Sequence, residues 1–122
     1  MLDQDILALV TLTITGLVVI TGFVILGSRY GYVLSSRWDQ ANRLLHLVLG
    51  LSLLVFVYML YGRLVLPLLV GLTGMLILAG RYGRGLPARW RIYNRWLHLA
   101  MGLVLALLVV LRHGSLFPEA IF

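Results

Sequence analysis

The sequence predicts an all-α integral membrane protein, a four-helix bundle made of two tandem two-helix repeats. Its composition does not suit a soluble domain, because 61% of the 122 residues are hydrophobic, only 11% are charged, and the mean hydropathy is +1.02. Soluble domains are roughly half apolar. Four stretches approach the roughly 20 apolar residues that a membrane-spanning helix needs. A segment containing one histidine, His46 or His98, also occurs twice.

The four predicted spanning helices comprise residues 6–27, 44–60, 64–80 and 96–111. None of these stretches carries Asp, Glu, Lys or Arg in its middle. The first follows the acidic residues Asp3 and Asp5 and is too long for the apolar core of a signal peptide, so we expect a retained helix. The third is the shortest, and Pro67 falls in its first turn, where a missing N–H costs little.

The second half of the chain repeats the first. Residues 20–51 align without a gap to residues 72–103, and 17 of these 32 positions are identical. The whole chain, 1–122, is therefore predicted to be a single transmembrane domain with repeat one at about 6–60, repeat two at about 64–112 and an outer tail at 113–122. Because each repeat contains two spans, both copies enter the membrane in the same sense. This predicts a pseudo-two-fold axis along the membrane normal.

The distribution of arginine predicts the orientation. All ten cationic residues are arginine, and eight of them belong to the first and third connections, whereas Arg63 and Arg112 lie on the other side. By the positive-inside rule we expect a multi-pass inner-membrane protein with both termini outside and the two arginine-rich connections in the cytoplasm. The net charge of +6 is thereby explained without nucleic acid as a partner.

His46 and His98 are the histidines inside the predicted spans. Each follows an arginine by three residues and therefore lies about 4.5 Å deeper in the membrane than that arginine. Gly50 and Gly102 come four residues later, on the same helical face, and should leave a recess beneath each ring. Intramembrane ionisable residues are costly and usually functional. Two neutral imidazoles at one depth can supply both axial ligands of a haem iron in a bundle core.

Haem b is therefore the predicted cofactor, with His46 and His98 as its metal ligands. Arg43 and Arg95 are predicted to pair with the haem propionates at the cytoplasmic surface, aided by Arg29 and Arg81.

Two further repeated features flank the histidines. Asn42 and Asn94 precede the histidines by four residues, and we expect them to cap their helices rather than to bind a propionate. The pairs Thr21-Gly22 and Thr73-Gly74 are predicted to allow close approach of helices, or to border the cofactor.

Other functions are compatible with the same residues. In one alternative each histidine ligates the magnesium of a separate chlorophyll-type pigment, and in another it bridges helices in a purely structural subunit of a larger complex. A proton-coupled transporter is disfavoured because no carboxylate lies inside a span. No set of nucleophile, base and orienting group suggests hydrolysis, so an electron carrier is favoured over a stand-alone enzyme. His113 has no counterpart in repeat one and is predicted to be a surface residue.

Residues 42–51 and 94–103 share the run Arg-x-Leu-His followed by an apolar, glycine-containing span. This run resembles the histidine-bearing helices of four-helix membrane b-type cytochromes, particularly hydrogenase-type cytochrome b subunits. The resemblance covers two of the four spans and implies electron transfer between quinone and a cytoplasmic redox partner. Such proteins usually carry further histidines for a second haem, which this chain lacks. The expected partners are the lipid bilayer and either other membrane subunits or a homo-oligomer.

Overall fold

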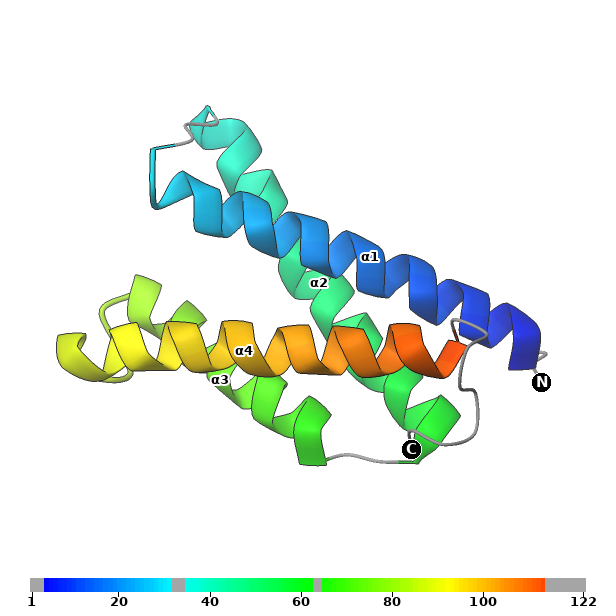
Figure 1. Cartoon of the computed structure of the whole chain (residues 1–122). Coiled ribbons are helices and arrows are strands. Elements are labelled where there is room, and N and C mark those ends of the chain that lie inside the picture. The colour runs from blue at the N-terminus through cyan, green and yellow to red at the C-terminus, as the bar shows by residue number, and fades with distance from the viewer. Residues whose placement is uncertain (1–3, 32–34, 63–64, 114–122) are drawn as a thin grey trace. The chain divides into compact units, whose positions relative to one another are not determined.

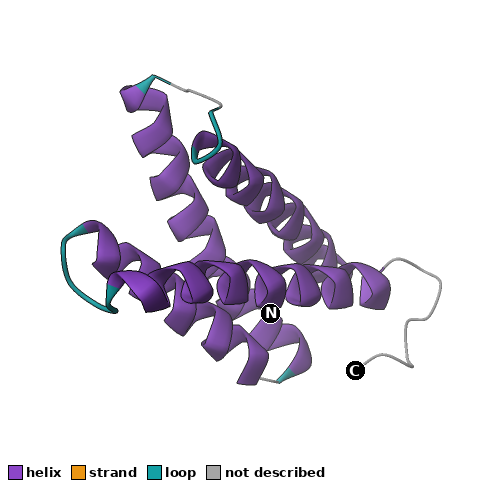
Figure 2. Cartoon of the chain, turned by 60° about the vertical axis from the view of Figure 1, so that its left-hand side comes forward, coloured by secondary structure: helices purple, strands orange, loops and turns teal. Residues whose placement is uncertain are grey.

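The computed structural model describes residues 4–31, 35–62 and 65–113, without the side chains of Gln4 and His113. They form four helices and no strand: α1 (Gln4–Ser28), α2 (Ser36–Tyr61), α3 (Val65–Arg81) and α4 (Ala88–His113), as Figures 1 and 2 show. The all-α prediction is confirmed. The chain divides into two compact units, Met1–Leu60 and Tyr61–Phe122, and their boundary falls where the sequence separates the two repeats. Apart from residue 113, the predicted outer tail lies outside the described residues.

Three of these helices are long and apolar enough to cross a membrane, namely α1, α2 and α4. The third helix is the exception, as its short apolar stretch predicted. It has 17 residues and is therefore about 25 Å long, somewhat less than a hydrocarbon core of about 30 Å. Pro67 is its third residue and is buried, in agreement with its predicted place in the first turn.

The second and fourth helices begin about two turns earlier than their apolar stretches. In α2 the carbonyl of Ser35 accepts a hydrogen bond from the N–H of Asp39 at 2.9 Å, and Asp39 lies in the first turn, where a negative charge is favourable. In α4 the carbonyl of Pro87 accepts hydrogen bonds from the N–H groups of Trp90 and Arg91. Hydropathy identifies only the apolar part of a helix, so the predicted connections were too long.

A glycine follows the last turn of both α1 and α3. Gly31 and Gly83 have φ angles of 109° and 74°, in the region that favours glycine. They close the matched triplets Arg29–Gly31 and Arg81–Gly83. In α3 the N–H of Gly83 donates to the carbonyl of Gly80 at 3.3 Å, a bond that uses one of the free carbonyls at a helix end. These glycines turn the chain towards the next helix of each unit.

Buried side chains lie at corresponding positions in the two units. Leu53 and Val57 are buried in α2, and Leu105 and Val109 are buried in α4, with the partners in each pair one helical turn apart. Within the second unit α3 packs against α4. Most other large apolar side chains of the four helices are exposed, as expected for surfaces that face lipid rather than water.

Candidate functional site

The His46 ring is held by two residues of α1. Its Nδ1 lies 2.8 Å from the hydroxyl oxygen of Thr21, and its edge lies against Gly22. Asn42, one turn before His46 on α2, donates a hydrogen bond from its side-chain amide to the backbone carbonyl of Thr21 at 3.1 Å. We call Thr21, Asn42 and His46 the Thr–Asn–His cluster of the first unit. It joins α1 to α2 through polar contacts.

The second unit contains the same cluster, formed by Thr73, Asn94 and His98. The hydroxyl oxygen of Thr73 lies 2.9 Å from His98 Nδ1, and the Asn94 amide donates to the carbonyl of Thr73 at 3.0 Å. Thr73 and Asn94 are both buried. In each unit, therefore, a threonine of one helix contacts an asparagine and a histidine from the same face of the next.

The hydrogen bonds of His98 define its tautomer. Nδ1 lies 3.1 Å from the backbone carbonyl oxygen of Val70, which can only accept, so Nδ1 carries a hydrogen and donates. The Thr73 hydroxyl donates its single hydrogen to the carbonyls of Leu69 and Val70, and its oxygen accepts from Nδ1. In the neutral imidazole this arrangement leaves the lone pair on Nε2, the nitrogen that is available to a metal.

The contacts of His46 are similar. The Thr21 hydroxyl lies 2.8 Å from the carbonyl of Leu17 and 3.0 Å from that of Val18, and its oxygen lies 2.8 Å from Nδ1 of His46. In both units, therefore, one ring nitrogen of the histidine is held by a threonine of the preceding helix, as is common for histidines that ligate metals.

A glycine of the preceding helix makes room for each ring. A Cβ added to Gly22 would lie 3.1 Å from Cε1 of His46, and one added to Gly74 would lie 3.1 Å from Cε1 of His98. Such a contact is shorter than normal carbon–carbon packing distances. Because Nδ1 is bonded to the adjacent threonine, the ring cannot move away without stretching that bond.

This contact predicts opposite effects for two substitutions in α1. Gly22→Ala should lower the free energy of unfolding by up to about 2 kcal/mol, because overpacking the ring tethered to Thr21 costs about 1–3 kcal/mol and the higher helix propensity of alanine offsets up to about 1 kcal/mol. Gly16→Ala adds the same methyl group to an exposed position with no heavy atom within 4 Å, and should be neutral or stabilising by up to about 1 kcal/mol. Unfolding of the detergent-solubilised variants in SDS, followed by circular dichroism, measures both. Equal effects would contradict the close approach of His46 to Gly22.

The other predicted site residues have different outcomes. Cβ atoms added to Gly50 and Gly102 would meet no heavy atom within 4 Å, so the glycines that contact the rings are Gly22 and Gly74. The predicted helix caps are wrong, because α2 and α4 begin well before Asn42 and Asn94. Exposed turns of helix precede these asparagines, and the asparagine side chains bond to the neighbouring helix.

The two predicted propionate-binding arginines, Arg43 and Arg95, differ in their ion-pair partners. Arg43 donates from Nε to the carboxylate of Asp39 at 3.0 Å and lies 3.4 Å from the hydroxyl of Ser28. In the second unit Arg91 takes the place of Asp39, and among the described residues no carboxylate lies within ion-pair distance of the exposed Arg95. Arg95 can therefore accept an anionic group without first losing a partner.

Sequence reasoning missed the role of Thr21 and Thr73. Both threonines recur at the same offset as the histidines, which was the available signal, but a threonine in an apolar helix is ordinarily read as a packing residue. Within the described residues no three His, Cys, Asp or Glu side chains gather to hold a metal ion. No family model, curated protein or solved structure matches the chain.

Proposed function

We propose that the chain is a multi-pass inner-membrane protein that binds one b-type haem through Nε2 of His46 and Nε2 of His98. One observation carries this proposal: in each unit Nδ1 of the histidine lies within hydrogen-bond distance of a threonine hydroxyl of the preceding helix. Histidines that ligate metals are held in this way. A single shared haem further requires the two units to form one four-helix bundle with pseudo-two-fold symmetry, and this arrangement is part of the proposal.

The remaining residues fit a haem near the cytoplasmic side. Arg95 is exposed about one turn from His98, and Arg43 lies about one turn from His46, so both are within a side chain's length of a group bound at the rings. A guanidinium pairs with a carboxylate through two hydrogen bonds, which suits the haem propionates. Bound haem would supply one-electron redox chemistry, so we assign the protein to electron transfer or to haem anchoring within a redox complex.

The orientation and the partners are parts of the same proposal. Eight arginines near the first and third connections favour a cytoplasmic location for these connections and an external one for both termini. A quinone or a cytoplasmic redox protein would exchange electrons with the haem, and other membrane subunits or a second copy of the chain would complete the complex.

A second candidate function is that of a structural or pigment-binding subunit. The bonds from Thr21 and Thr73 to the histidines join neighbouring helices, as polar groups often do in membranes. A chlorophyll-type magnesium needs one histidine, so two pigments would not require the two units to approach each other.

The absorption spectrum of the protein, purified in detergent after expression with added haem, tests these candidates. We expect the sharp bands of low-spin haem after dithionite reduction, and a pyridine haemochrome assay that identifies haem b. A chlorin spectrum would support pigment binding instead. A colourless protein with the full helical circular dichroism spectrum would contradict the haem proposal and favour the structural subunit.

A further inference from the structure

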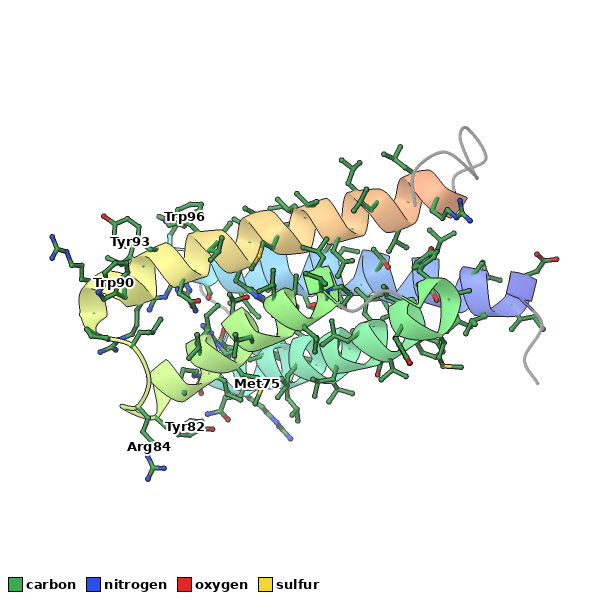
Figure 3. The ribbon with its side chains drawn as sticks, turned by 90° about the horizontal axis from the view of Figure 1, so that it is seen from below. Met75, Tyr82, Arg84, Trp90, Tyr93 and Trp96 are labelled. Carbon is green, nitrogen blue, oxygen red and sulfur yellow. The ribbon has the colours of Figure 1, made fainter. Side chains whose placement is uncertain are left out.

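The polar end of the second unit is strongly basic and rich in exposed aromatic side chains. We define the basic end of this unit as Arg81, Arg84 and Arg89 with Trp90 and Tyr93. All five are exposed, Trp90 to 56% and Tyr93 to 63%. The rings of Trp90 and Tyr93 contact each other, with centroids 5.9 Å apart. Figure 3 shows Tyr82, Arg84, Trp90 and Tyr93 at the end of α3 and α4 where these helices are joined.

At this end α4 has an inner face and an outer face with different neighbours. The inner face is directed to α3, because Arg91 lies against Gly80, with its Cδ 3.3 Å from an added Cβ, and Asn94 and His98 bond to α3 residues. Arg89, Tyr93 and Trp96 follow a spacing of four and then three residues and form the opposite face, which is exposed. The basic end therefore belongs to the outer surface of the unit.

No acidic residue lies among the described residues of α3, α4 and their connection. The sequence contains no Asp or Glu between residues 65 and 113, whereas in the first unit Asp39 pairs with Arg43. At the aligned positions of that unit, Asp39 replaces Arg91, Ala41 replaces Tyr93 and Leu44 replaces Trp96. Differences at these positions all make the second unit more cationic or more aromatic than the first.

We infer that the basic end binds the head group of an anionic phospholipid. Arginine binds phosphate through paired, charge-assisted hydrogen bonds, and tryptophan and tyrosine favour the depth of lipid head groups. A lipid fits better than a soluble acidic protein because the surface continues directly into the apolar span, where Trp96 and Leu97 are half-exposed within the next turn. The inference rests on the proposed membrane location and is independent of haem.

The test uses the tryptophans as local reporters in nanodiscs. Trp38→Phe leaves Trp90 and Trp96, in the second unit, as the emitting residues, whereas Trp90→Phe combined with Trp96→Phe leaves Trp38 in the first. Each protein is placed in discs of mixed phosphatidylglycerol and phosphatidylcholine in which either one or the other lipid is brominated. Brominated phosphatidylglycerol should quench the second-unit reporter more strongly than brominated phosphatidylcholine at the same mole fraction. The first-unit reporter should distinguish the two lipids much less.

Matched charge variants locate the binding surface. Arg84→Gln with Arg89→Gln should lower the association of phosphatidylglycerol with the second-unit reporter by about fivefold per arginine. Arg29→Gln with Arg37→Gln removes the same net charge from the first unit and should leave that preference unchanged. Circular dichroism checks that both pairs fold.

Three results would overturn the inference. The first is equal quenching by the two lipids at the second-unit reporter. The second is an equal loss of preference in both charge variants, which would indicate a net-charge effect without a local surface. The third is binding of soluble polyglutamate to the basic end in discs that show no lipid preference, which would identify an acidic protein as the partner.

Discussion

Replacing either His46 or His98 by alanine is expected to abolish the low-spin haem spectrum of the purified protein. Under the proposed function each histidine supplies one axial ligand of the same ring, so both variants should lose haem to a similar extent. Loss of a hydrogen bond behind a metal ligand lowers metal affinity by about 10–100-fold, and loss of the ligand itself should exceed this. The measurement is the haem-to-protein ratio and the reduced spectrum after identical expression and purification.

Two controls separate loss of ligation from loss of folding in these variants. His113→Ala removes a histidine that has no counterpart in the first repeat, and it should keep the wild-type spectrum. Free imidazole added to His98→Ala should restore low-spin bands if the ring occupied a ligand position in a folded protein. Normal haem binding by one histidine variant and none by the other would rule out a site shared between the two units.

The helices could be predicted from the sequence because apolar runs of this length have few alternatives. Three predicted stretches lie inside α1, α2 and α4, and the third, 64–80, agrees with α3 (Val65–Arg81), the shortest helix, to within one residue at each end. The first turns of α2 and α4 were not predicted, since their residues are polar and carry no hydropathy signal. Local interactions stabilise them instead, such as the Asp39–Arg43 pair one turn apart in α2.

The residues of the candidate site could be picked out from the sequence, but their contacts could not. The histidines and the repeated threonine–glycine pairs are conspicuous as matched residues, but 25 positions separate Thr21 from His46 and Thr73 from His98. Their contact depends on how two helices align along their lengths, which periodicity within one helix does not specify. The sequence therefore identified the two histidines, whereas the structure identified what holds each ring.

Thr73→Val is expected to weaken the hydrogen bonding of Nδ1–H of His98 without changing the tautomer. Valine has nearly the shape of threonine but cannot accept the Nδ1 hydrogen, so the Val70 carbonyl, 3.1 Å from Nδ1, remains as its acceptor. Nitrogen NMR of protein labelled with ¹⁵N-histidine, without haem, should show Nδ1–H in both proteins, with the Nδ1 resonance shifted in the variant. Thr73→Ser keeps the hydroxyl and should resemble the wild type.

The same variant has a second readout in the haem-loaded protein. Donation from Nδ1–H makes Nε2 a stronger electron donor and stabilises ferric over ferrous iron, so Thr73→Val should raise the midpoint potential. A tenfold selective loss of ferric affinity corresponds to about 59 mV. Thr13→Val, which removes an exposed hydroxyl bonded to its own helix at Leu9, should change neither the potential nor the Nδ1 resonance. An Nε2–H histidine in the wild-type protein would contradict the geometry of the cluster, whereas the expected tautomer in a protein that binds no haem would contradict only the proposed cofactor.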